Sequence, residues 1–260
     1  MKEKEKEIIY YKDELNDEFS KAVIIPKTID ENYKYINDGF WGKVSHFFWY
    51  RCIAIPLAYL YSKITLHLKI KNKKVLKSVK NEGYFLFGNH TQEIGDALIP
   101  TLVSYPRTTY VIVHPNNLAI KFIGKLTPKL GALPLPGNLK SSRNFLSAVE
   151  KRVLQGNAVM IYPEAHIWPY YTKIRPFLSV SFKYPVKFDV PSFCITTTYQ
   201  KRKHSLKPKL TTYVDGPFYP NKDLTIKEQQ EELRNQIYTC MVTRSKNSTY
   251  EYIKYIKGDN

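Results

Sequence analysis

His90 and Asp96 are the two residues whose types and spacing suggest chemistry most directly. They lie in the stretch Phe87-Gly88-Asn89-His90-Thr91-Gln92-Glu93-Ile94-Gly95-Asp96, directly after an apolar run. An imidazole titrates close to neutral pH and can therefore take a proton from an alcohol. A neighbouring carboxylate can hold the ring in one tautomer and stabilise its protonated form. The sequence predicts a catalytic pair in which His90 is the general base and Asp96 orients it, with Glu93 as the alternative partner.

A second polar loop follows the apolar run Val159-Met160-Ile161-Tyr162-Pro163 and contains Glu164 and His166. Glu164 can accept hydrogen bonds from a substrate or can anchor the loop itself, and the sequence leaves both alternatives open. We expect Glu164 to bind substrate. We expect His166 to add a second polar contact, although a loop histidine is often only solvated.

The residues after this loop combine aromatic rings with two cations, Lys173 and Arg175. The rings of Trp168, Tyr170 and Tyr171 can pack on lipid or on an acyl chain while the cations bind a phosphate group. They can equally form a rigid lid that stiffens the Glu164 loop. We predict that Lys173 and Arg175 bind substrate.

Alternating strands and helices position these loops. Strands separated by helices of this length require crossover connections, which favour a largely parallel sheet covered on both faces. We therefore predict an α/β fold with a mostly parallel mixed sheet flanked by helices. The expected strands cover residues 65–70, 83–87, 109–114, 132–135, 158–162, 193–199 and 210–214, and the expected helices cover residues 97–104, 118–126, 141–154 and 226–244.

The N-terminal part of the chain, residues 1–66, differs in character from residues 67–260, which we expect to form the catalytic domain. Residues 1–22 are charged and mildly helical, and no apolar core of a signal peptide follows the basic start. Residues 40–66 are rich in Trp, Tyr and Phe, with Lys and Arg around them. This composition predicts an amphipathic helix lying in a membrane interface, with an ordinary core helix as the alternative.

Composition and charge limit the partners of the protein. A hydrophobic content of 43% argues against general disorder, and a net charge of +17 favours anionic partners. The three cysteines, Cys52, Cys194 and Cys240, show no metal-type spacing and no disulfide framework. The sequence pattern argues against a nucleic-acid partner, because aromatic and basic residues interleave only at residues 199–204. We expect no metal and no cofactor.

The motifs resemble those of the glycerolipid acyltransferases, the family typified by lysophosphatidate (1-acylglycerol-3-phosphate) acyltransferase. The first family block, Asn-His followed by an Asp, matches Asn89-His90 and Asp96, and the third block matches Tyr162-Pro163-Glu164. Gly131-Ala132-Leu133-Pro134 and Val190-Pro191 match the second and fourth blocks more weakly. The order and rough spacing of the four blocks agree over about residues 45–220.

The sequence departs from this family in two respects. Five residues instead of four separate His90 from Asp96, so Gly95 must absorb the extra residue in a bulged turn if Asp96 is the partner. The arginines that the family associates with the phosphate of the acceptor are missing from the second and third blocks. The candidates to replace them are Lys140, Arg143, Lys173 and Arg175, and Arg175 ranks first because it follows the third block closely.

The resemblance implies O-acyl transfer from an acyl thioester, either acyl-CoA or acyl-carrier protein, to a hydroxyl of a lysophospholipid or related glycerolipid. His90 and Asp96 take the catalytic roles, and Asn89, Glu164, His166, Lys173 and Arg175 bind substrate. Backbone N–H groups near the loop are expected to meet the developing oxyanion. The expected location is the cytoplasmic side of the cell membrane, at an anionic surface. A non-catalytic lipid-binding relative of the same fold is the alternative, and a basic nucleic-acid-binding protein is a more distant one.

Overall fold

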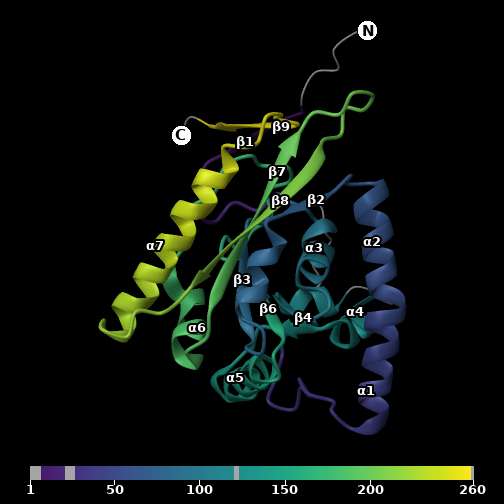
Figure 1. The fold of residues 1–260 in the computed structure, drawn as a ribbon, viewed down its shortest axis with the longest axis vertical. Coiled ribbons are helices and arrows are strands. Elements are labelled where there is room, and N and C mark those ends of the chain that lie inside the picture. The colour runs from purple at the N-terminus through teal and green to yellow at the C-terminus, as the bar shows by residue number, and fades with distance from the viewer. Residues whose placement is uncertain (1–6, 21–26, 120–122, 259–260) are drawn as a thin grey trace.

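The computed structural model of the chain describes residues 7–20, 27–119 and 123–258. Its centre is a seven-stranded sheet in the order β2-β8-β7-β3-β6-β4-β5, with helices on both faces (Figure 1). All strand pairs in this sheet are parallel except β7 and β8, so the predicted mixed, mostly parallel α/β fold is confirmed. The strands are β2 (Lys69–Lys71), β3 (Tyr84–Gly88), β4 (Thr109–Val113), β5 (Ala132–Pro134), β6 (Ala158–Ile161), β7 (Ser192–Gln200) and β8 (Lys209–Phe218).

The central strand β3 is buried along its whole length, as its uninterrupted apolar sequence requires. Phe85 and Phe87 belong to the core cluster that also contains residues of α5 (Leu139–Leu154), α6 (Lys183–Phe188) and α7 (Ile226–Ser245). Tyr84 and Leu86 belong to a second cluster, which includes residues of α3 (Gly95–Ser104). Because alternate side chains of a strand point to opposite faces, β3 is held from both sides, and its C-terminal end is fixed.

The helices agree with the sequence prediction in part. A capping box formed by Asn138 and Ser141 begins α5, and its length matches the expected helix. Within the described part of the helix expected at residues 118–126, α4 covers Ile123–Leu126, while Leu118 belongs to a 3₁₀ turn over Pro115–Leu118. Residues 120–122 of that prediction lie outside the described part of the chain. The short helix α6 was not predicted.

The aromatic segment forms one nearly continuous helical rod along a side of the molecule (Figure 1). It consists of α1 (Phe40–Phe47), a π-helical stretch (Phe48–Ala54) and α2 (Ile55–Ile64). The π-helical stretch ends two residues before Pro56, whose ring would collide with the preceding turn of a regular α-helix. Tyr50 fixes the rod to the body of the protein, since its hydroxyl accepts a hydrogen bond from the Thr109 N–H at 2.8 Å.

The helical tendency expected for residues 1–22 is wrong for the part that the structure describes. Residues Glu7–Tyr11 form β1, which pairs in parallel with β9 (Ile253–Lys257) in a separate two-stranded sheet. Ile8, Ile9, Tyr10 and Tyr11 have high strand propensity, and pairing with β9 outweighs the weak helical pattern. This pairing brings a strand near the start of the described chain beside a strand near its end (Figure 1).

Candidate active site

The C-terminal end of β3 places His90 at the edge of the sheet, and α3 returns Asp96 to it. The Nδ1 atom of His90 lies 2.8 Å from Oδ2 of Asp96. The same oxygen accepts hydrogen bonds from the backbone N–H groups of Thr91 and Gln92, each at 2.9 Å. Asp96, rather than the exposed Glu93, is therefore the partner of His90 in this structure.

Gly95 allows the loop to accommodate its extra residue. It is the first residue of α3, and the Asp96 N–H donates to the Gln92 carbonyl at 3.0 Å, which closes the turn. A Cβ atom on Gly95 would lie 2.9 Å from the Cβ of Gln92. Glycine is therefore needed here for this close approach.

The two side chains of the pair differ in their exposure to solvent. Asp96 is buried, and burial raises the pKa of its carboxyl group, while the hydrogen bond from His90 acts in the opposite direction. The His90 side chain keeps 19% of its surface exposed. Because Asp96 holds Nδ1, the second ring nitrogen, Nε2, is the one left to meet a substrate. A proton arriving on the ring would be stabilised by a buried negative charge.

Tyr162 contacts both members of the pair, a role that the sequence did not reveal. Its ring stacks on the imidazole of His90 with 4.4 Å between ring centroids and 17° between planes. Its hydroxyl donates to the backbone carbonyl of Asp96 at 2.6 Å. Burial raises the pKa of Tyr162 well above the ordinary value, so the hydroxyl stays protonated and remains a donor. Its position directly before Pro163-Glu164 was the one available signal.

Glu164 joins the two loops. Its Oε2 atom accepts a hydrogen bond from the His90 N–H at 3.0 Å, and Oε1 accepts one from the Arg175 N–H at 3.0 Å. Its carboxylate also lies 3.6 Å from the Arg175 guanidinium, and both side chains are fully enclosed. Of the two alternatives that the sequence left open, the structure shows the anchoring contact.

Arg175 points into the protein and cannot meet an acceptor phosphate in this arrangement. Only 1% of its surface is exposed. The guanidinium donates to the backbone carbonyls of Glu14, Glu164 and His166, and it lies 4.9 Å above the ring of Trp168. The expectation that Arg175 replaces the missing phosphate-binding arginines is therefore not supported, because the guanidinium is buried and both of its terminal nitrogens already donate to backbone carbonyls.

The remaining predicted site residues occupy three different environments. Asn89 is buried, and its amide exchanges two hydrogen bonds with the backbone of Thr197, at 2.9 and 3.0 Å, which fixes the end of β3 to β7. The Nδ1 atom of His166 lies 3.3 Å from Glu18 in the N-terminal segment. Lys173 is exposed at the surface. Substrate contacts by these three residues stay predictions.

The N–H groups of the His90 loop are already engaged. That of His90 donates to Glu164, and those of Thr91 and Gln92 donate to Asp96. The expectation that N–H groups near this loop bind the oxyanion therefore fails for these three positions. Tyr199 adds to the same network, because its hydroxyl donates to Oγ1 of Thr91 at 2.6 Å. The loop is thus held in place from β6 and β7 before any substrate binds.

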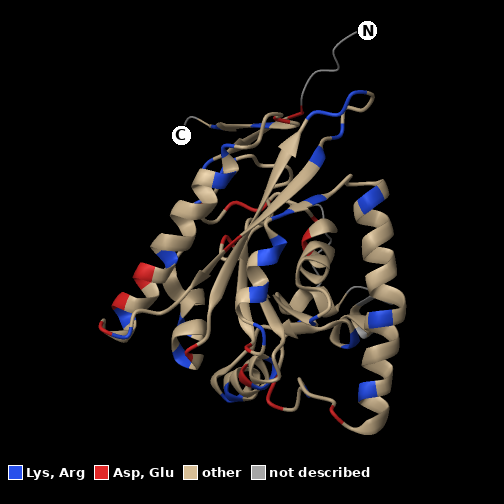
Figure 2. Ribbon diagram, in the orientation of Figure 1, with Lys and Arg blue, Asp and Glu red and all other residues tan. Residues whose placement is uncertain are grey.

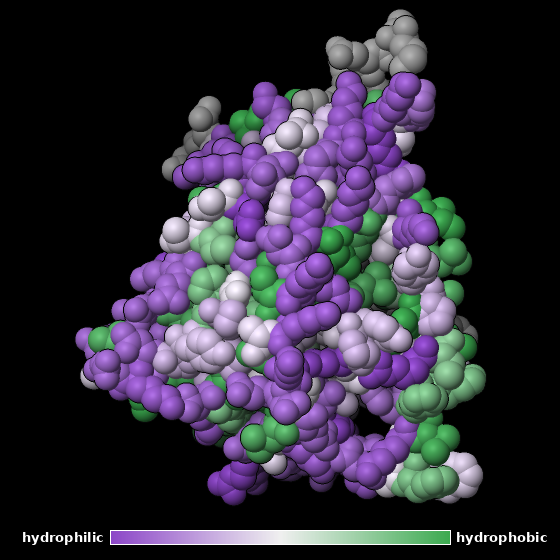
Figure 3. Space-filling view, viewed as in Figure 1, coloured by the Kyte–Doolittle hydropathy of each residue, from purple (hydrophilic) through white to green (hydrophobic). Residues whose placement is uncertain are grey.

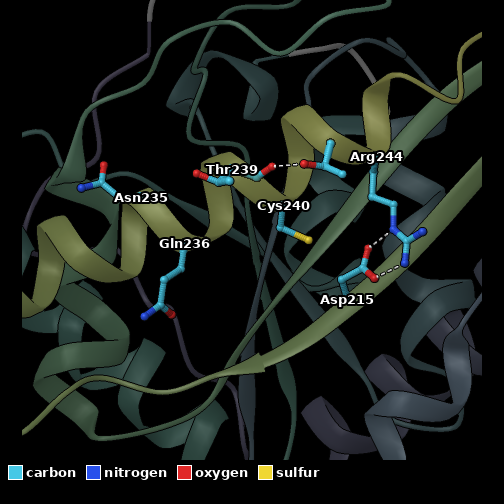
Figure 4. A pocket seen from close by; sticks show the side chains of 7 residues that line it. Asp215, Asn235, Gln236, Thr239, Cys240 and Arg244 are labelled. Carbon is cyan, nitrogen blue, oxygen red and sulfur yellow. Dashed lines mark hydrogen bonds and ion pairs between the residues drawn. The ribbon is translucent and has the colours of Figure 1, made fainter.

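A hollow of about 800 Å³ lies elsewhere, beside α7 and the strand β8 (Figure 4). Next to it, the described residues place Cys194, Asp215 and Cys240 close enough to share a metal ion. Arg244, however, binds both carboxylate oxygens of Asp215, at 2.6 and 2.8 Å. The guanidinium already supplies the positive charge that a cation would bring. None of the residues that line this hollow belongs to the predicted site.

Comparisons with known proteins identify the family and the fold. The sequence matches the protein family described as Acyltransferase over residues 67–197. A comparison with curated proteins gave no match. Among solved structures, the fold is similar to that of PlsC from Thermotoga maritima, a 1-acyl-sn-glycerophosphate (LPA) acyltransferase. The TM-score is 0.51 and the identity 13%, covering 81% of this chain and 97% of that one.

At this level of identity the structural similarity concerns the fold. The family match carries more, because it spans half of the chain and includes both the His90 loop and the Glu164 loop. The chain belongs to the acyltransferase family.

Proposed function

We propose that the protein transfers a fatty acyl group from an acyl thioester to a hydroxyl of a lysophospholipid or related glycerolipid. The observation that carries this proposal is the contact of 2.8 Å between His90 and the buried Asp96, at an accessible edge of an acyltransferase fold. The similarity to PlsC, which by its description acts on 1-acyl-sn-glycerophosphate, supports a lipid acceptor.

In the proposed reaction, His90 acts as the general base. Its Nε2 atom takes the proton of the acceptor hydroxyl while the hydroxyl oxygen attacks the thioester carbonyl. The tetrahedral intermediate then collapses, the carbon–sulfur bond breaks, and the imidazolium returns the proton to the departing thiolate. Asp96 stabilises the imidazolium, because the proton on the ring offsets the buried carboxylate charge.

The donor is acyl-CoA or an acyl-carrier protein, and the proposed mechanism uses no metal and no cofactor. A covalent acyl-enzyme is unnecessary, since the hydroxyl attacks the thioester directly. Two of the three cysteines, Cys194 on β7 and Cys240 on α7, lie next to each other and outside the His90 loop network. Within the described network around His90, the groups present serve proton transfer and loop positioning.

The surface of the helical rod is evidence for a membrane-bound enzyme. Its outer face exposes large apolar side chains, and Figure 3 shows hydrophobic surface along this edge of the molecule. Among the residues that the structure describes, no helix has the length and apolar character to cross a bilayer. We propose that the rod lies in the interface of the cytoplasmic membrane leaflet, where Trp and Tyr side chains are favoured.

Serine substitution of three exposed apolar residues of α1 is expected to weaken membrane binding. Phe40, Trp41 and Phe47 are 72%, 79% and 62% exposed, so their replacement removes apolar contact with lipid without opening the core. The partition coefficient onto phospholipid vesicles, measured by sedimentation, should fall by at least tenfold. Deleting residues 1–66 would be a poorer test, because Glu14 and Glu18 contact the active-site loops.

The matched control replaces three equally exposed apolar residues on other helices, Leu139, Leu154 and Ile226, with serine. This control should sediment like the unmodified protein. Equal loss of vesicle binding in both triple variants would show that the rod has no special role.

Measuring thioester consumption tests the proposed function and its alternative, a lipid-binding protein without catalysis. The purified protein is incubated with an acyl thioester and a panel of lysophospholipids. Free thiol and a new acyl ester should appear together for at least one acceptor. Binding of lysolipid without thiol release across the panel would support the non-catalytic alternative.

A further inference from the structure

The loop that connects β7 and β8, residues 201–208, is exposed and strongly basic. No Asp or Glu occurs between residues 190 and 214. Within the loop, Lys201, Lys203, His204 and Lys207 are all exposed. Figure 2 shows Lys and Arg gathered where the hairpin projects beyond the sheet. Cations gathered on a projecting loop produce a positive potential that attracts anionic surfaces.

Arg202 gives this loop a fixed shape. Its Nε atom donates to the Pro208 carbonyl at 3.0 Å, which closes the loop, and its Nη2 atom donates to the Thr65 carbonyl just after α2. The arginine is therefore used inside the structure, while the three lysines point outward. Leu206 lies among them with 51% of its surface exposed, so the loop offers an apolar side chain within a ring of positive charge.

The basic surface continues onto the neighbouring strand. The edge strand β2 pairs with β8, and it carries the exposed Lys69 and Lys71. No acidic residue occurs between residues 39 and 81, which include the rod and β2. The exposed Ile64 ends α2 at this place, so the apolar face of the rod and the basic hairpin meet. A flat partner with an anionic surface and an apolar interior would bind the apolar face of the rod and the basic hairpin together.

The strand that leads into the hairpin contacts the loop of the catalytic pair. Tyr199 lies two residues before Lys201, and its hydroxyl donates to Thr91, which follows His90. A surface bound to the hairpin is therefore held near the loop that carries the proposed general base.

We propose that residues 201–208 bind the anionic headgroups of a lipid bilayer and set the active-site edge of the protein against that bilayer. This inference rests on the proposed membrane-bound function and extends it to a segment outside the rod. The exposed Leu206 and Ile64 favour a bilayer over an acidic protein or a nucleic acid, because a bilayer accepts apolar side chains below a layer of negative charge.

The test replaces Lys201, Lys203 and Lys207 with serine in the full-length protein. Partitioning onto vesicles of phosphatidylcholine with phosphatidylserine is compared with partitioning onto phosphatidylcholine alone. Each lysine near an anionic surface strengthens binding by roughly fivefold, so the triple variant should bind anionic vesicles about 100-fold more weakly. Its binding to neutral vesicles should not change.

The control variant replaces Lys183, Lys187 and Lys227, which are exposed at the far end of the molecule, with serine. It carries the same change of charge and should lose much less binding than the hairpin variant. Equal losses in the two triple variants would overturn the inference. So would a hairpin variant that keeps its vesicle binding but no longer binds single-stranded RNA. The vesicle measurement involves no acyl transfer, so it decides the inference whether or not the proposed activity is found.

Discussion

Replacing His90 with alanine is expected to reduce the rate of acyl transfer by about 10²–10⁴-fold, because the acceptor hydroxyl loses its general base. The side chain lies partly at the surface, and Asp96 keeps its two backbone hydrogen bonds from Thr91 and Gln92. The free energy of unfolding should therefore change by about 1 kcal/mol. Steady-state kinetics and urea denaturation of the same preparation measure the two effects separately.

His90→Asn is the matched control for this prediction. The asparagine amide can place a donor near the former Nδ1 position and keep the hydrogen bond to Asp96, but it cannot take a proton. Its activity should be as low as that of His90→Ala, while its stability matches that of the unmodified protein. If either variant kept acyl transfer within a few-fold of normal, His90 would not be the base.

Glu164→Gln is expected to reduce the free energy of unfolding by about 3–5 kcal/mol, the usual cost of breaking a buried ion pair. The substitution leaves the enclosed Arg175 guanidinium without its counter-charge. It also turns an amide NH₂ group toward the N–H of His90 or of Arg175, where an acceptor is needed. Urea denaturation measures the loss.

A double variant, Glu164→Gln with Arg175→Met, separates charge pairing from general damage. Because Met carries no charge, the double variant should lose less stability than the sum of the two single variants. The exposed pair of Lys222 and Asp189 gives a control, since Asp189→Asn should cost less than about 1 kcal/mol. A similarly small loss for Glu164→Gln would mean that the pair does not hold the two loops together.

Much of the sheet could be predicted, because its strands are continuous apolar runs bounded by helices with clear patterns. The run at Phe85-Leu86-Phe87 became a central strand, as its apolar sequence on both faces requires. The pairing of β1 with β9 could not be predicted, because it joins opposite ends of the chain. No local pattern specifies such a distant partner.

Site residues could be predicted where the residue type itself implies a chemical role. They could not be predicted where the role depends on whether the side chain is buried in the fold. The histidine and its carboxylate are close in sequence, so their contact could be predicted, with Glu93 as the alternative partner; the observed turn at Gly95 decides between the two. Arg175 looked like a surface cation following an aromatic run, but Glu164 and backbone carbonyls enclose it. The position of Tyr162 before Pro163-Glu164 did not predict its stacking on His90, because that contact needs β6 beside β3.

Acceptor dependence of thiol release tests the central claim most directly. The purified protein is given an acyl thioester together with a lysophospholipid, or with the deoxy analogue that lacks the free hydroxyl. Thiol and new ester are both quantified, and the intact mass of the protein is recorded. Direct attack by the acceptor hydroxyl, with His90 as the base, predicts equal amounts of thiol and ester with the lysophospholipid. It predicts neither product with the deoxy analogue. Thiol release with the deoxy analogue, or an acylated protein, would contradict the account.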